Sequence, residues 1–296
     1  MMYHLPLLTS SEFATYLLNG ISQGMIIFLV ASGLTLIFGL IGLINFAHGA
    51  LVALGGYGTL LIADATGSFW LGLFGAIALV ALLGLVLERS VLHRVYERPL
   101  LGFLGTFGMY VVIEELISFQ FGDQARQIAS PLPGYVSFMG ATYPKHRLLI
   151  IAIGFAVALG IGALLSYTRL GMEIHATATE SETAEILGVD SARVYTLTFV
   201  IGAALAALAG GLTGPVTSVS PGMGMSYMIL AFLVIIVGGM GSFKGSFLVS
   251  LIVGQITAFG WLFLQPTYVR LGVFVAAMVF ILYKPRGFFG KPEVFE

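Results

Sequence analysis

Charge is the property that this sequence lacks most. Asp, Glu, Lys and Arg make up 9% of its 296 residues and apolar residues make up 58%, with a mean hydropathy of +1.01. A soluble domain carries roughly 25% charge. So few charges cannot cover a water-facing globule of this size, and lipid must therefore be the solvent. Because no long polar block is present, we expect one transmembrane domain over residues 1–296.

Further absences exclude other classes of protein. Cysteine is absent, which excludes disulfides and Cys-ligated metals. The five histidines are scattered singly and no Ser-His-Asp arrangement can be proposed, so we expect neither a metal site nor an enzyme active site. The net charge of −1 gives no reason to expect a nucleic-acid partner. No Gly-x-x-x-x-Gly-Lys-Ser/Thr phosphate loop is present, so we expect no cofactor in this chain and any ATP hydrolysis on other chains.

The apolar segments predict an all-α, polytopic membrane bundle. A helix needs about 20 apolar residues to cross ~30 Å of hydrocarbon, and we expect roughly eight to ten crossings on that basis. Two segments, 48–64 and 225–240, are short enough to be interrupted or re-entrant. The predicted segments are 13–38, 48–64, 68–88, 99–122, 148–168, 193–214, 225–240, 245–264 and 269–283.

Glycine is abundant, with 39 residues, and small residues allow transmembrane helices to approach closely. Gly20 and Gly24 are spaced for such an approach. The series Gly102, Gly105 and Gly108 predicts a second face against which another helix packs.

The basic residues predict an orientation, because positively charged loops stay in the cytoplasm. Three clusters can all be cytoplasmic at once, and Lys244 joins them, which leaves four basic residues outside. We therefore expect an external N-terminus, an external loop at 123–147 and a cytoplasmic C-terminus. The three clusters are Arg89, Arg94 and Arg98; Arg169 and Arg193; and Lys284, Arg286 and Lys291.

Two glycine-bounded interruptions, 39–49 and 238–245, each separate two apolar helices. Each precedes a basic cluster by a similar distance, as duplicated halves would. Interrupted helices in corresponding positions point to the solute path of a transporter. Two ordinary glycine turns would give the same pattern.

The one substantial polar segment is the loop at residues 170–192, which contains five of the 14 acidic residues. Ile174, Ala178, Ala184, Ile186 and Leu187 form a short, broken apolar stripe if the segment is helical. Gly188 is a plausible helix stop. We expect a short amphipathic helix along the inner membrane face, against the alternative of a solvated loop without a partner.

Several stretches together resemble one family of permeases. Glu173 to Val189 is similar to the segment by which the permeases of ABC importers dock onto their ATPase subunits. With 33–58, 194–215 and 237–254, the chain resembles the branched-chain amino acid ABC importer permeases of the LivH type over about residues 15–285. The run Ile44-Asn-Phe-Ala-His-Gly49 is the most specific element. Family members often carry a glutamate where this chain has Ala50, which leaves the solute open.

The resemblance implies partners and a task. It implies a second, related permease subunit, two cytoplasmic ATPase subunits that bind ATP and magnesium, an external solute-binding protein and a bacterial inner membrane. It implies transport of branched-chain amino acids or, in related members, of urea, amides or aromatic acids. Within the segment similar to the docking segment, we expect Glu173, Glu182, Ala184, Glu185 and Gly188 to contact the ATPase.

Polar residues within spans are the candidates for the solute path, because such groups face protein or water. We expect Asn45 and His48 in the first interruption to contribute most, followed by Ser242 in the second. Asn19 and Gln23, in the outer part of the first span, complete the set. Alternatively, His48 is a neutral imidazole that only bonds a loop carbonyl.

Glu114 and Glu115 are the one acidic pair deep within a predicted span. Neighbouring residues on a helix point about 100° apart, so both cannot face one lumen. They leave open a second class of function, an ion-coupled secondary transporter or channel. A third class, a membrane scaffold without transport activity, is disfavoured by the interrupted helices.

Overall fold

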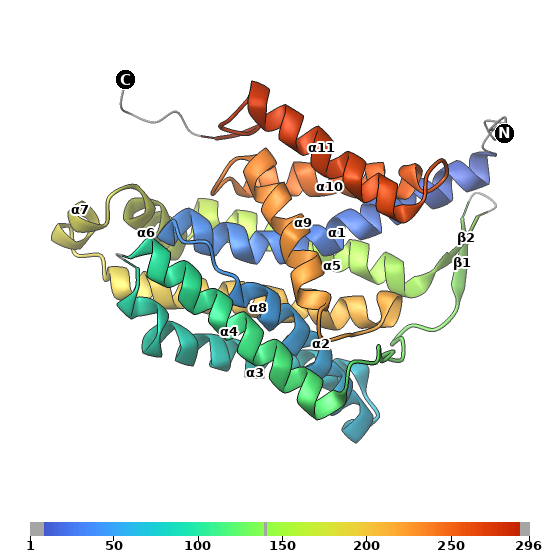
Figure 1. The fold of residues 1–296 in the computed structure, drawn as a ribbon, viewed down its shortest axis with the longest axis horizontal. Helices are drawn as coiled ribbons and strands as arrows, with labels where there is room; N and C mark the ends of the chain where they lie inside the picture. Colours follow the sequence, from blue (N-terminus) through green and yellow to red (C-terminus); the bar gives the residue numbers. More distant parts are fainter. Residues whose placement is uncertain (1–8, 97, 139–140, 291–296) are drawn as a thin grey trace.

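The computed structural model describes residues 9–96, 98–138 and 141–290 and is an all-helical bundle with one small hairpin (Figure 1). Eight of the described helices are long and apolar enough to cross a membrane, within the expected eight to ten. The helices are α1 Ser10–Ile41, α2 Ala47–Thr66, α3 Phe69–Ser90, η1 Leu92–Arg94, α4 Pro99–Phe121, α5 Lys145–Tyr167, α6 Arg169–Thr179, α7 Ser181–Ile186, α8 Ser191–Thr217, α9 Met223–Gly238, α10 Phe243–Gly260 and α11 Pro266–Tyr283; the strands are β1 Tyr135–Phe138 and β2 Ala141–Pro144.

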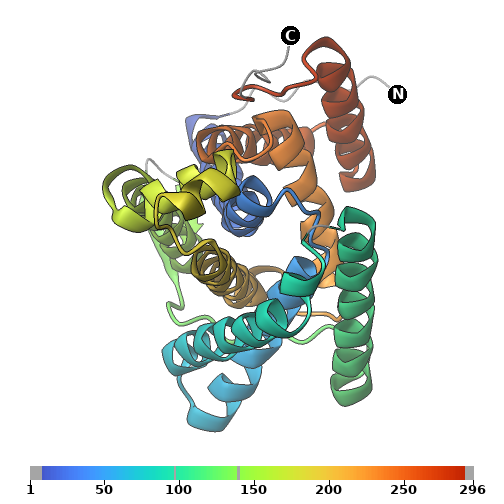
Figure 2. The ribbon, with the colours of Figure 1, turned by 90° about the vertical axis from the view of Figure 1, so that its left-hand side faces the viewer.

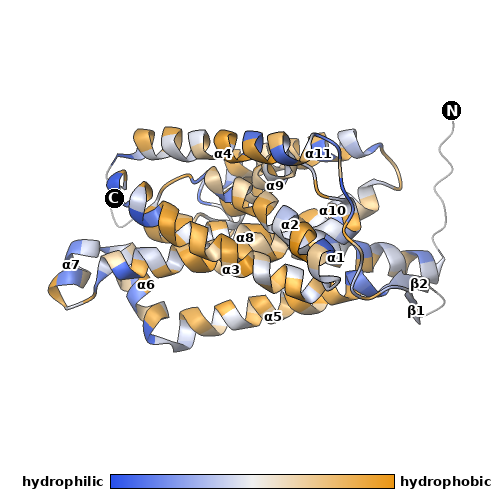
Figure 3. Cartoon of the chain, turned by 90° about the horizontal axis from the view of Figure 1, so that it is seen from below, coloured by the Kyte–Doolittle hydropathy of each residue, from blue (hydrophilic) through white to orange (hydrophobic). Residues whose placement is uncertain are grey.

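The first helix is the centre of the bundle. Every residue of α1 from Gly24 to Ile37 is buried, and α5, α8, α9 and α10 pack around it. A helix that is apolar all round is the kind that protein surrounds. The helices α4, α5 and α11 are mostly exposed and lie on the outside (Figure 2). Their apolar surfaces, coloured orange in Figure 3, are the surfaces that lipid or another membrane subunit can cover.

Two of the segments depart from a simple crossing. α1 has 32 residues, which is roughly 48 Å at 1.5 Å per residue, so it must tilt or protrude from a hydrocarbon core of ~30 Å. α9 has 16 residues and lies steeply inclined to its neighbours (Figure 1). The expected short segment at 225–240 is thus a helix that crosses the bundle obliquely.

One end of the bundle carries residues of the predicted basic clusters. Leu40 at the end of α1 packs with Ile174 of α6 and Val194 of α8, and Arg89 and Arg193 line one cavity there. The chain after α11 joins the same end, because the N–H of Phe288 donates to Val237. The hairpin β1–β2 lies at the opposite end, where α1 begins (Figure 1).

The expected glycine contacts occur on α1 and are mostly absent from α4. A Cβ at Gly254 of α10 would lie 2.6 Å from Cα of Gly24, and one at Gly24 would lie 2.9 Å from the carbonyl oxygen of Ser250. On α4, Gly102 meets Leu43, whereas Gly105 and Gly108 face open space. Within this chain, the predicted packed face is therefore confined to Gly102, because spacing alone does not say whether a neighbouring helix is present.

Gly254→Ala is expected to destabilise the protein by about 1–3 kcal/mol, since the methyl group overpacks the contact between α1 and α10. Gly105→Ala is the matched control. It adds the same methyl group to a helix where space is open, so it is expected to be neutral or slightly stabilising. Thermal unfolding of both variants in detergent measures the difference. Equal unfolding temperatures would contradict this packing.

Candidate translocation site and coupling segment

The chain between α1 and α2 turns back into the bundle without helical structure. α1 is terminated by Gly42, whose φ of +70° is a left-handed value that favours glycine. His48, in the first turn of α2, donates from Nε2 to the carbonyl oxygen of Val30 at 3.0 Å. Val30 lies 11 residues before Ile41 at the end of α1, or roughly 16 Å along the axis. α2 therefore begins beside the middle of α1 and not at the end of the bundle.

Buried polar groups without partners gather at this start of α2. Asn45 is fully buried, and neither its side-chain oxygen nor its nitrogen has a hydrogen-bond partner among the described residues. Nδ1 of His48 is likewise unpaired there, and Phe46 precedes α2 without a side-chain capping bond. Buried polar groups are nearly always paired, and helix N-termini bind anions through free N–H groups. The backbone N–H groups of His48 and Gly49 already donate to Asn45 and Phe46, so the free donor of this cluster is the amide nitrogen of Asn45. The amide oxygen of Asn45 and Nδ1 of the Nε2-protonated His48 are acceptors, so the cluster offers a polar solute one donor and two acceptors.

Aromatic side chains pack around Phe46, the residue that follows Asn45. The ring of Phe46 lies 5.3 and 5.7 Å from those of Phe103 and Phe107 on α4, and 5.4 Å from that of Phe232 on α9. Backbone contact adds to this packing, because a Cβ at Gly49 would lie 3.1 Å from the carbonyl oxygen of Gly224. Asn45 is therefore fully enclosed in the described conformation, and its neighbour Phe46 packs against α4 and α9.

The second interruption lies at the end of the bundle that carries the basic clusters. Gly239 and Gly241 have φ values of +101° and +77°, and Ser242 caps α10 by accepting from the N–H of Gly245 at 3.1 Å. A Cβ at Gly39 would lie 3.0 Å from Cα of Gly241, so the two interruptions touch. The hydroxyl oxygen of Ser242 therefore already accepts a hydrogen bond within the helix cap.

The candidate path residues do not form one site. Asn19 lies 11 residues before Val30 on α1, roughly 16 Å along the axis, and accepts from Nη1 of Arg147. Gln23, one turn further on, is half-buried. The structure places Asn45 and His48 together, Asn19 and Gln23 in the first half of α1, and Ser242 at the start of α10.

Glu114 and Glu115 diverge as their spacing requires. Glu115 is exposed on the outside of α4, and Glu114 is half-buried. A Cβ at Gly222, just before α9, would lie 3.3 Å from Oε1 of Glu114. The two carboxylates therefore do not share one lumen.

The polar segment 170–192 forms two short helices, α6 and α7, instead of the single one expected. Gly188, with φ of +91°, ends α7 in a Schellman motif: its N–H donates to Glu185 at 2.9 Å, and that of Val189 donates to Ala184 at 3.0 Å. This bears out its expected place as a helix stop. Glu182 and Glu185 are exposed on α7, and Glu173 is half-buried on α6.

The expected apolar stripe of this segment divides into two surfaces. Ile174 and Ala184 are buried, and Ile174 packs against Leu40 and Val194, the ends of two membrane helices. Ile186 and Leu187 are instead 85% and 79% exposed. The segment break at Glu180 rotates α7 relative to α6, so one helical stripe could not continue through both. One surface anchors the segment, and the other presents apolar side chains among carboxylates.

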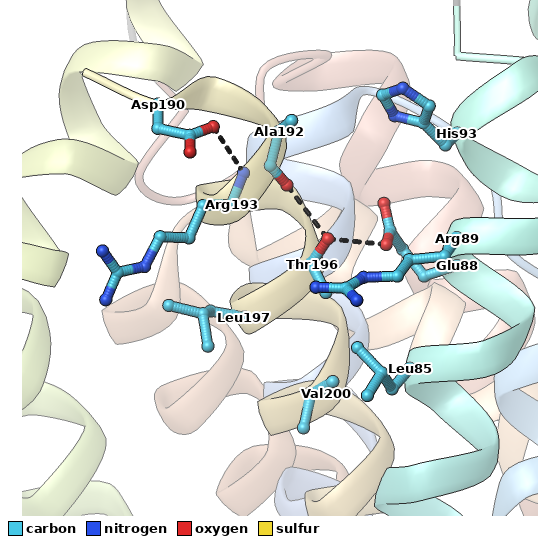
Figure 4. Close-up of a pocket in the computed structure, with 10 residues that line it drawn as sticks. All are labelled: Leu85, Glu88, Arg89, His93, Asp190, Ala192, Arg193, Thr196, Leu197 and Val200. Atoms are coloured by element: carbon cyan, nitrogen blue, oxygen red, sulfur yellow. Dashed lines mark hydrogen bonds between the residues drawn. The ribbon is translucent and has the colours of Figure 1, made fainter. Parts of the chain in front are cut away.

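One buried carboxylate was missed from the sequence. Glu88, at the end of α3, is 1% exposed and accepts from Oη of Tyr96 at 2.8 Å and Oγ1 of Thr196 at 2.7 Å (Figure 4 shows Thr196). Burial, followed by the hydrogen bond to Glu88, raises the pKa of Tyr96 far above its usual range, so the phenol remains a donor. The sequence signal that could have revealed Glu88 is its position as a lone acidic residue close to Arg89 and Arg94.

Comparison with known proteins places the chain. The family described as branched-chain amino acid transport system / permease component matches residues 16–282. The chain belongs to this family. It is 31% identical to the high-affinity branched-chain amino acid transport system permease protein BraD of Pseudomonas aeruginosa, over 94% of this chain and 96% of that one. It is also 31% identical to LivH of Escherichia coli K12, over 95% and 97%.

Some less similar relatives of this chain are named for the transport of other solutes. The ribose import permease protein RbsC of Haemophilus influenzae is 28% identical over 80% of this chain and 75% of the relative. No solved structure matches the chain. The chain belongs to a permease family, and its described residues include eight helices that are apolar and long enough to span a membrane, so it is a multi-pass membrane transport protein.

Glu88→Ala is expected to destabilise this permease by about 1–3 kcal/mol, because Tyr96 loses a buried acceptor and α3 loses its bond to α8. Asp64→Ala, which removes an exposed carboxylate from α2, is the control and is expected to have no effect. Thermal unfolding followed by circular dichroism compares them. An unchanged midpoint for Glu88→Ala would show that its hydrogen bonds do not hold α3 to α8.

Proposed function

We propose that this chain is the permease subunit of an ATP-driven importer, with one transmembrane domain, and that it carries a branched-chain amino acid or a related small amphipathic solute across a bacterial inner membrane. The buried, unpaired amide of Asn45 at the start of α2, in a chain of this family, carries the proposal. The relatives BraD and LivH are named for branched-chain amino acid transport.

The site suits a zwitterionic solute at both ends. The amide nitrogen of Asn45 would donate to the carboxylate, and the positive end of the α2 dipole would favour its negative charge. The unwound stretch between Ile41 and Ala47 would offer carbonyl oxygens to the ammonium group, as interrupted helices do in transporters. Because Asn45 is fully enclosed, solute can reach it only after neighbouring helices move.

The proposed partners follow from the two ends of the bundle. The basic end is cytoplasmic in this proposal, and α6 and α7 dock onto an ATPase there through the exposed Ile186 and Leu187 with Glu182 and Glu185. The hairpin end faces an external solute-binding protein. Two ATPase subunits with bound ATP and magnesium supply the energy, and a second, related permease subunit completes the pathway, with the exposed outer helices as available surfaces.

The solute itself has alternatives. Urea, amides or aromatic acids are solutes of related permeases. The similarity to a ribose import permease shows that chains similar to this one are named for sugars as well. Ala50, where family members often carry a glutamate, is fully enclosed beside His48 and offers solute no charged group. The ligand of the cognate binding protein, measured by calorimetry, identifies the solute, because selectivity resides largely in that protein.

An ion-coupled transporter remains the alternative from another class. It would use Glu114, the half-buried member of the acidic pair. Liposomes that contain this chain alone distinguish the two functions. Solute accumulation driven by an ion gradient favours the alternative, and accumulation that requires ATP and partner subunits favours the importer.

Asn45→Leu is expected to abolish uptake without reducing assembly of the importer, because the isosteric apolar side chain removes the donor at the start of α2. Asn45→Asp is expected to abolish uptake of a carboxylate solute as well, through charge repulsion. Ile44→Leu, at the exposed neighbouring position, is the control. Radiolabelled uptake by cells with equal amounts of assembled importer is the measurement. Normal uptake by Asn45→Leu would refute the site.

Gly188→Val is expected to lower both ATPase co-purification and uptake at least tenfold, since a β-branched residue at φ of +91° breaks the end of α7. Gly67→Val is the control. It imposes similar strain at φ of +70°, but Gly67 follows the last residue of α2 and is not part of the docking segment. It is expected to leave recruitment intact. Equal recruitment by both variants would remove the docking role of α7. A charge reversal, Glu185→Lys, tests the same surface without altering the turn.

A further inference from the structure

A cavity of about 660 Å³ lies between α3 and α8, at the end of the bundle that carries α6 and α7 (Figure 4). This volume is in the range of small-molecule sites. Arg89 of α3 and Arg193 of α8 are the arginines of its lining, and Leu85, Leu197 and Val200 form its apolar part. The cavity takes no part in the proposed solute path, which runs beside Asn45.

The cavity is graded from cationic to apolar along the membrane normal. α3 ends at this surface and α8 begins there, so Arg89 and Arg193 lie at one level. Leu85 and Leu197 are each four residues further in, about one helical turn or ~5.4 Å deeper. Val200 continues the apolar side along α8. A ligand that fits has an anionic group at the membrane surface and an acyl chain below it.

Among the described residues, the lining side chains that have no hydrogen-bond partner include those of Arg89, Arg193 and His93. Glu88 already accepts from Tyr96 and Thr196, and Asp190 accepts from the backbone N–H of Arg193 at 3.0 Å. The side chains of Arg89 and Arg193 make no hydrogen bond or ion pair to the residues that the structure describes. Guanidinium groups bind phosphate oxygens bidentately.

We propose that this cavity binds a phospholipid, with the phosphate held by Arg89 and Arg193 and an acyl chain along Leu85, Leu197 and Val200. Basic pockets between membrane helices are known to bind lipid headgroups. The two acidic side chains nearby offset the net charge, so the phosphate itself, and not overall charge, directs recognition. The proposal requires only that this end of the bundle lies at a membrane surface, whichever side that is.

Native mass spectrometry of the full chain in non-ionic detergent tests the proposal with matched ligands. Dioleoylphosphatidylglycerol carries both phosphate and acyl chains, dioleoylglycerol lacks the phosphate, and glycerol 3-phosphate lacks the acyl chains. Only the first is expected to bind tightly. Equal binding of dioleoylglycerol would overturn the role of the phosphate, and equal binding of glycerol 3-phosphate would assign the cavity to a soluble phosphate compound instead.

Arg89→Gln and Arg193→Gln are each expected to weaken phosphatidylglycerol binding about fivefold. Arg94→Gln removes a charge from the same end, outside the cavity lining, and is expected to change nothing. Leu197→Trp fills the apolar part and is expected to weaken phosphatidylglycerol binding as well. If the glutamine variants lose helical structure, Arg89→Lys and Arg193→Lys keep the charge and are expected to retain most binding. Equal affinity in all folded variants, or loss of the lipid when a second permease chain assembles over the cavity, would overturn the proposal.

Discussion

The close approach of backbones around α1 is the constraint on which the rest of the structure depends. Lipid provides no hydrophobic drive between helices, so packing must come from contact. Gly24 meets α10, Gly33 meets α8 at Gly202, and Gly39 meets the turn at Gly241. Three neighbours thus touch one helix at three depths. α1 is held as an axis, and the segments that leave it, including the unwound stretch after Gly42, are placed relative to it.

That rigid axis explains how the bundle tolerates an unsatisfied amide. Burying an unpaired polar group costs roughly 1–3 kcal/mol, and Asn45 carries two such atoms. The chain can hold Asn45 there because His48 is fixed to Val30 and Phe46 is fixed among three aromatic rings. A solute that satisfies the amide would recover that free energy, which gives a physical reason for the group to be kept.

The sequence predicts the helices and the breaks between them, but it does not predict which residues meet in space. Charge scarcity and apolar length define the helices, and the glycine punctuation locates the breaks at Gly42 and Gly239, because these properties are local. Partners in space are not local. Spacing could not show that Gly105 faces open space, that Asn19 is taken by Arg147, or that Ile186 turns outward from the stripe that Ile174 begins. Glu88 was overlooked because its donors, Tyr96 and Thr196, come from different segments.

The start of α2 inside the bundle has a consequence for ions. A helix carries about half a positive elementary charge at its N-terminus, and in α2 that end lies beside α1 in the interior of the bundle, where Ala47 to Ala50 are all buried. In so low a dielectric the half-charge acts strongly on anything that enters. It attracts a carboxylate and repels sodium ions and hydronium. A pathway built around this helix end would pass its solute while keeping the membrane tight against cation leakage, which a cell that stores energy as a proton gradient needs from every importer it inserts.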